Sequence, residues 1–193
     1  MDASSRFAVV DVETSGLSPK RHRLLQVAVV VVRADGTVEE RWSSYVRPRW
    51  WRLARTGPTR LHGITRRHLR DGQPLAAVLE QLSTRLDGAV LVAHNAAFDA
   101  EFLRRGAART GVRLAWAEEL CTLGLSRRLD ADRALSHHLA DVCARYGITV
   151  DRPHDALADA EATAALLPHL LVAHGLPRPA GPGPAQLDDV SPR

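Results

Sequence analysis

Hydrophobic residues in the first 46 positions fall into three short runs separated by polar residues. Runs 7–12 and 24–32 are short and rich in valine, which favours strands. Run 24–32 is apolar on successive positions, so we expect this strand to be buried on both faces. A third strand is predicted over 37–46, and the Asp35-Gly36 pair before it is a strong hairpin signal. The three strands are therefore predicted to form an antiparallel meander.

Helical periodicity dominates the rest of the chain. A helix is predicted to begin near Pro74, because leucine and valine between 75 and 82 recur on one face. Residues 89–93 form a further short apolar strand, and Asn95 stands at the N-cap position of the helix that follows.

Two more helices are predicted towards the carboxyl end. One begins near Ser136, carries a single apolar stripe and ends at Gly147, a residue suited to a helix C-terminus. The other runs from about Asp155 to His174. Pro168 lies inside it, so we expect a kink or a break in the preceding turn.

The composition fits one domain followed by a tail. The 193 residues are 45% hydrophobic and 25% charged, which excludes a collagen, a coiled coil and a wholly disordered chain. From residue 176 to 193 the sequence shifts to proline, glycine and polar residues without periodicity. We therefore predict a domain over 1–175 and a flexible tail over 176–193.

Charge and cysteine content indicate which ligands and which cellular compartment suit the protein. Lys+Arg 26 minus Asp+Glu 22 leaves +4, and Lys20 is the only lysine, so the positive charge is almost all arginine, which suits phosphate. Two cysteines are too few for a disulfide framework, which favours a cytoplasmic location. The longest apolar run, 27–32, is too short to cross a bilayer, so no membrane association is expected. The oligomeric state stays open.

The first strand carries two candidate metal ligands. Side chains alternate along a strand, so Asp11 and Glu13 point to the same side, about 7 Å apart. No arginine or lysine lies near them on that strand, and an ionised carboxylate that leaves water needs a partner. A divalent cation is the simplest partner; the alternative is that both acids are surface residues at a frayed strand end.

Three further candidates lie in two later segments. Asp99 falls in the first turn of a predicted helix, where the helix dipole alone would explain an acid. His154 and Asp159 are five residues apart, about 140° around a helix, so they cannot face one site from the same helix. We therefore expect His154 on the loop before the helix, with Asp155 as its N-cap. Taken alone, a histidine at position 154 is more often a surface or capping residue than a catalyst.

Together these acids and the histidine resemble the DEDDh 3′→5′ exonuclease family, which includes bacterial polymerase proofreading subunits. The resemblance covers about residues 6–171. Ser15 departs from it, because the family commonly has a second threonine there, and residues 47–59 diverge more. The resemblance rests on four segments: 11–17 (DVETSGL), 61–65 (LHGIT), 94–99 (HNAAFD) and 154–159 (HDALAD).

The resemblance implies a fold and a catalytic apparatus. The fold would be ribonuclease H-like, a mixed α/β sheet whose first strands are antiparallel and which helices flank. Two divalent cations, Mg²⁺ or Mn²⁺, would be held by Asp11, Glu13 and Asp159, with Asp99 assisting. His154 would be the general base that takes a proton from the attacking water.

The same likeness implies a binding site for the 3′-terminal nucleotide. Three of its members have simpler alternatives: to begin with, Leu17 could pack in the core and Asn95 could be a helix cap. Phe98 could likewise pack against Phe102. The candidate substrate-binding residues are Thr14, Leu17, His62, Ile64, Asn95 and Phe98.

The implied activity is metal-dependent hydrolysis of single-stranded 3′ ends, with DNA favoured over RNA. The alternatives are an RNA exonuclease resembling oligoribonuclease and a non-catalytic nucleic-acid-binding module of the same fold. Residues 186–190 (QLDDV) faintly resemble a sliding-clamp-binding peptide, so a polymerase or clamp is a candidate partner of the tail. Trp50 and Trp51 among arginines could stack on bases or pack within the loop.

Overall fold

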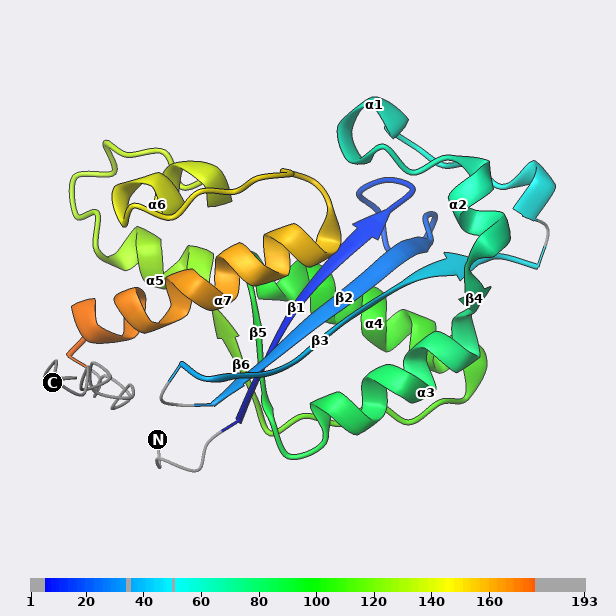
Figure 1. Ribbon diagram of the computed structural model, residues 1–193, viewed down its shortest axis with the longest axis horizontal. Helices are drawn as coiled ribbons and strands as arrows, with labels where there is room; N and C mark the ends of the chain where they lie inside the picture. The colour runs from blue at the N-terminus through cyan, green and yellow to red at the C-terminus, as the bar shows by residue number, and fades with distance from the viewer. Residues whose placement is uncertain (1–5, 34–35, 50, 176–193) are drawn as a thin grey trace, which may run out of the picture.

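A six-stranded mixed sheet forms the centre of the protein (Figure 1). The computed structural model describes residues 6–33, 36–49 and 51–175, without the side chain of Trp51. The strands are β1 (Arg6–Thr14), β2 (Leu24–Arg33), β3 (Val38–Arg47), β4 (Gln73–Pro74), β5 (Val90–Ala93) and β6 (Glu118–Cys121). Their order is β4-β3-β2-β1-β5-β6. β1, β2 and β3 pair antiparallel, whereas β5 joins β1, and β6 joins β5, in parallel. The predicted mixed α/β sheet is confirmed.

The meander forms as its hydrophobic pattern predicts. The first nine residues of β2 are all buried, because β2 lies inside the sheet and both of its faces are covered. At the β2–β3 turn the backbone N–H of Gly36 donates to the carbonyl of Arg33 over 3.0 Å. Gly36 adopts φ 82°, a conformation that glycine accepts without strain.

Helices cover both faces of the sheet (Figure 1). On one face lie α3 (Leu75–Leu86) and α4 (Ala96–Thr110). On the other lies α7 (Ala156–Ala173), against which α5 (Thr122–Arg128) and α6 (Leu139–Arg145) pack. The connection from β3 to β4 contains η1 (Trp51–Leu53), α1 (Thr59–His62) and α2 (Arg66–Asp71).

Alternation along β1 decides which layer each of its side chains meets. Ala8 and Val10 join the core beneath α3 and α4. Phe7 and Val9 pack instead against the alanine-rich face of α7. Asp11 and Glu13 continue this second face, which directs both carboxylates towards the α7 side.

Pro168 lies inside the last helix without breaking it; a kink or a break was expected in the preceding turn, and the break does not occur. α7 is continuous from Ala156 to Ala173. Leu167 and Leu171 are buried against the sheet, and Leu166 and Leu170 against α5 and α6. Burial of each leucine stabilises by about 1.5–3 kcal/mol, which together outweighs the ~3 kcal/mol cost of an interior proline.

α7 is also, within the described residues, the one helix long and apolar enough to cross a membrane. Yet 56% of it is buried inside the domain, as is usual for a core helix. This is weak support for a membrane span. The expectation of no membrane partner stays a prediction.

The elements that the hydrophobic pattern did not predict are short or polar. β6 contains two glutamates and lies at the sheet edge, and α1 has only four residues. Such segments carry too few apolar positions to show a period. The predicted tail, 176–193, and Trp50 lie outside the described residues.

Candidate active site

Asp99 approaches β1 from the α3/α4 side of the sheet. It lies in the first turn of α4, as predicted, and its side chain is only 4% exposed. Its Oδ1 accepts a hydrogen bond from the backbone N–H of Val12 over 3.2 Å. This bond attaches α4 to β1 midway between Asp11 and Glu13.

His154 and Asp159 approach from the other side of the sheet. His154 precedes α7, and Asp155 is the N-cap, with its Oδ1 accepting from the N–H of Ala158 over 3.2 Å. Both features agree with the sequence prediction. The backbone N–H of His154 donates to Oδ2 of Asp159 over 3.0 Å, while the His154 side chain is exposed. His154 adopts φ 66°, so the loop turns sharply just before the helix.

The tertiary structure brings three of the predicted side chains within reach of one ion. One ligand atom each from Glu13, His154 and Asp159 lies within 4.8 Å of the others. Asp11 and Asp99 do not belong to this set. Among the described residues, no lysine or arginine forms an ion pair with any of the four acids.

Burial and mutual repulsion make the ionised cluster unfavourable. Burial raises the pKa of Asp11 well above its ordinary value, and the charges of Asp99, Asp159 and Glu13 raise it further. Burial, followed by the charges of Asp159 and Asp155, raises the pKa of Glu13 to about 8. Asp155, expected only to cap the helix, therefore adds to the negative potential. A bound cation is the partner that would let these groups ionise at neutral pH.

The pKa of the Asp99 carboxyl is also raised well above its ordinary value, chiefly by burial. Hydrogen bonds from backbone N–H groups oppose the rise. Burial likewise raises the pKa of Asp159, and the hydrogen bond from His154 opposes it.

We expect the metal-free protein to lose stability as pH rises from 5 to 8.5. Folded Glu13, with its pKa raised to about 8, keeps a proton that the unfolded chain releases near pH 4.3, so unfolding gains favour across this window. Thermal unfolding in EDTA at successive pH values measures the effect. Glu13→Gln should flatten the fall in Tm, whereas Glu118→Gln, on exposed β6, should not. Equal slopes for wild type and Glu13→Gln would contradict this assignment.

The loop after β1 projects Leu17 into solvent. Leu17 is 84% exposed, which excludes core packing as its role. Ser15 N–H donates to the carbonyl of Arg23, and Arg23 N–H donates back to the Ser15 hydroxyl, both over 3.0 Å. His22, which the sequence reasoning missed, lies so close to Gly16 that a Cβ there would come within 2.6 Å of its ring. These contacts hold the loop in one shape.

The hydroxyl of Thr14 makes its hydrogen bond within this loop. It donates to the carbonyl of Gly16 over 2.9 Å, and the Thr14 side chain is buried. Any contact that Thr14 makes with substrate would therefore use its backbone.

The segment that contains His62 and Ile64 differs from expectation in one respect. Ile64 is 1% exposed and packs with Leu25 and Leu69, so its side chain cannot contact substrate in this structure. Nδ1 of His62 accepts from the N–H of Ile64, and Nε2–H donates to the carbonyl of Thr56, each over 3.0 Å. His62 is buried, which lowers its pKa, and the charge of His154 lowers it further.

Asn95 and Phe98 lie at the start of α4. Asn95 occupies the N-cap position with φ 89°, but its side chain makes no capping hydrogen bond and is exposed. The alternative of a capping side chain is therefore wrong. Phe98 is partly buried and packs on Phe102, with ring centroids 4.9 Å apart.

The fold and the candidate site together define the class of enzyme to which the chain belongs. A ribonuclease H-like sheet whose first strand carries two acids, joined by an acid from α4 and an acid and a histidine from α7, is the arrangement of DEDDh-type 3′→5′ exonucleases. The RNase_T family model, described as Exonuclease, matches residues 8–167. The chain belongs to this exonuclease family.

Known proteins resemble the chain over most of its length. It is 35% identical over 167 residues to the 3′-5′ exonuclease DinG of Bacillus subtilis, covering 86% of this chain and 18% of DinG. It is 35% identical over 161 residues to the PolC-type DNA polymerase III of Streptococcus thermophilus, covering 83% of this chain and 11% of PolC. The zinc-bound complex of Escherichia coli exonuclease I with single-stranded DNA matches with TM-score 0.78 and 25% identity, covering 88% of this chain and 41% of that one. The chain thus spans less than half the length of each of these relatives.

Proposed function

We propose that this chain hydrolyses the 3′-terminal phosphodiester of single-stranded nucleic acid, DNA in preference to RNA, and releases nucleoside 5′-monophosphates. The observation that carries the proposal is the convergence of acids from β1, α4 and α7 at the end of β1 without an ion-pair partner among the described residues. Burial, and then mutual repulsion, raise the pKa values of these acids, so the ionised cluster is costly to keep unless it binds cations.

The residues fit two divalent metal ions. Asp11, Glu13 and Asp159 would hold them and Asp99 would assist; carboxylate oxygens suit Mg²⁺ and Mn²⁺. When bound, the ions would stabilise charge on the attacking and leaving oxygens of the phosphodiester. The exonuclease family depends on divalent metal, and a zinc-bound form of E. coli exonuclease I exists, which supports a metal centre here.

His154 would act as general base. Its exposed imidazole stands on the loop before α7, and the bond from its backbone to Asp159 keeps it beside the acids. The imidazole would take a proton from the attacking water. The phosphorus–oxygen bond to the 3′ oxygen of the penultimate nucleotide would then break, and that oxygen would take up a proton from a solvent water.

The loop between β1 and β2 would receive the terminal nucleotide. Leu17 would wedge against the base, because its side chain is exposed on a loop that backbone bonds hold in place. Asn95, whose exposed side chain is not used as a helix cap, would contact the same nucleotide. His62 would hold the backbone from Thr56 to Ile64 in place at the rim.

The preference for DNA is supported by relatives. E. coli exonuclease I has been solved with dT13 and dA16 oligonucleotides, and PolC is a DNA polymerase. We further propose a cytoplasmic location and a polymerase or sliding clamp as partner.

The test is a cleavage assay with the purified 193-residue chain. The substrates are 5′-labelled single-stranded DNA, the matching RNA and a mismatched primer terminus, each with Mg²⁺, Mn²⁺ or EDTA. We expect a ladder that shortens from the 3′ end, faster on DNA than on RNA and absent in EDTA. Faster cleavage of RNA would make it an RNA exonuclease, and binding without cleavage under every metal would make it a binding module.

A further inference from the structure

Two adjoining hollows lie at the end of the sheet where β1 ends. The first, of about 620 Å³, is bordered by the start of β2, the end of β3 and the ends of α3 and α4 that meet there. The second, of about 720 Å³, extends from Ser15 to the loop 53–57. Arg23, Leu24, Pro48 and Arg49 border both, so the two hollows form one groove, here called the arginine groove.

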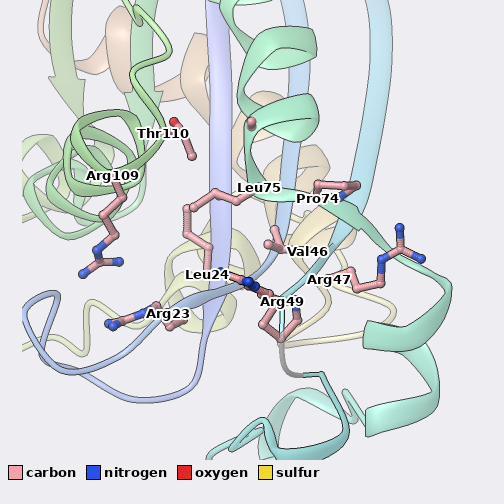
Figure 2. A pocket seen from close by; sticks show the side chains of 11 residues that line it. Arg23, Leu24, Val46, Arg47, Arg49, Pro74, Leu75, Arg109 and Thr110 are labelled. Atoms are coloured by element: carbon pink, nitrogen blue, oxygen red, sulfur yellow. The ribbon is translucent and has the colours of Figure 1, made fainter.

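The arginine groove is strongly positive for a chain whose net charge is only +4. No aspartate or glutamate lines it among the described residues. Figure 2 shows Arg109 and Arg23 on one side of the first hollow and Arg47 on the opposite side, with Leu24 and Leu75 between them. The arginines of the groove are Arg21, Arg23, Arg47, Arg49, Arg55 and Arg109.

Carboxylates do not neutralise most of this charge. Arg109 donates to the carbonyl of Pro19 over 2.9 Å, and Arg23 to the carbonyl of His22 over 3.0 Å. Burial lowers the pKa of Arg109, and the charge of Arg23 lowers it further, so the two cations repel each other. An anion in the groove would relieve this repulsion. The arginine–carboxylate ion pairs among described residues involve none of Arg21, Arg23, Arg47, Arg55 and Arg109.

The groove and the candidate active site both adjoin the carboxyl end of β1. Ser15, which lines the second hollow, is two residues beyond Glu13 and exchanges backbone and hydroxyl hydrogen bonds with Arg23. The floor is apolar, with Leu24, Val46 and Leu75, and Leu53 at its edge is 79% exposed. Guanidinium groups above an apolar floor suit a chain that carries both phosphates and unpaired bases.

We propose that the arginine groove binds the single strand upstream of its 3′ end, its arginines contacting phosphates and its apolar floor contacting bases or sugars. This inference rests on the proposed function. The acids would hold the terminal phosphodiester, and the strand would pass the end of β1 into the groove. Affinity should therefore grow with strand length beyond the terminal nucleotides.

Binding of fluorescein-labelled dT3 and dT12 to the full chain in EDTA, followed by fluorescence anisotropy, tests the groove without turnover. Wild type should bind dT12 much more tightly than dT3. The pair Arg47→Glu and Arg109→Glu should raise the Kd for dT12 at least about tenfold and lessen the preference for length. The slope of log Kd against log salt should fall by about 0.7 for each phosphate that the variant no longer binds.

Arg127→Glu combined with Arg128→Glu is the matched control, because this pair makes the same charge change on α5, on the α7 side of the sheet. Arg47→Glu alone guards against misfolding, since Arg47 is exposed and makes no side-chain hydrogen bond with a described residue. A Kd for the Arg47→Glu/Arg109→Glu pair equal to that of the Arg127→Glu/Arg128→Glu pair would overturn the proposal. The proposal would also be overturned if poly-glutamate displaced labelled dT12 as effectively as unlabelled dT12 does. That result would indicate an acidic protein partner.

The result is independent of whether the chain is a nuclease. Loss of dT12 binding in groove variants of a chain that never cleaves DNA would retain the groove and refute the proposed function. If the chain cleaves DNA but its groove variants bind dT12 like wild type, the proposed function stands and the proposed role of the groove is refuted.

Discussion

Asp11→Asn is expected to abolish metal binding and lower turnover by at least about 10²-fold, the scale of losing one electrostatic stabiliser in an active site. The same variant should make the metal-free protein more stable. Burial and the charges of Asp99, Asp159 and Glu13 disfavour the ionised form of Asp11. Asparagine has nearly the same shape as aspartate but carries no charge. The residue would thus be retained for chemistry at a cost in stability.

Two measurements check this expectation. Calorimetric titration with Mn²⁺ should show loss of affinity, and thermal unfolding in EDTA should show a higher Tm, by about 2–4 °C for each kcal/mol gained. The gain should grow as pH rises, because burial raises the pKa of the wild-type carboxyl and its ionisation costs the folded state stability, a cost that asparagine lacks. Asp132→Asn, at an exposed position after α5, is the matched control. Unaltered Mn²⁺ affinity, or a lower Tm in EDTA, would refute the role of Asp11.

His154→Ala is expected to lower kcat by about 10²–10⁴, the usual share of general acid–base catalysis, while oligonucleotide affinity stays nearly intact. The imidazole is exposed and makes no described side-chain hydrogen bond, whereas the bond to Asp159 uses the backbone N–H, which alanine retains.

A second variant, His154→Asn, separates loss of the imidazole from strain in the backbone at this position. His154 adopts φ 66°, a conformation that asparagine tolerates better than alanine, so a fall in kcat shared by both variants would come from the missing base. Added imidazole should restore part of the rate. An unchanged kcat, or a loss that appears only with alanine, would assign His154 to the backbone turn instead.

Much of the fold follows from local pattern. The valine runs of β1 and β2 and the Gly36 turn predict the meander, because burial on both faces and positive φ leave clear signatures. The same alternation places Asp11 and Glu13 on one face of β1. Helical geometry likewise separates His154 from Asp159, and the structure has His154 before α7 with Asp155 as the cap.

Other features depend on contacts between distant segments. Ile64 belongs to a sequence motif that suggests substrate, yet packing with Leu25 and Leu69 buries it. Asn95 stands at a cap position, but its left-handed backbone leaves the side chain exposed. Pro168 remains inside α7 because leucines on either side of it are buried by two different layers.

The amino-acid sequence alone determined β1, β2, β3 and β5, the order of the acids and the family likeness, since each depends on residues close together in the chain. Only the tertiary structure decided that β1, α4 and α7 crowd their carboxylates together, and that Arg23, Arg47 and Arg109 line one groove. The physical reason is that burial and electrostatic repulsion depend on distances in space. Those distances are set by how the helices pack on the two faces of the sheet.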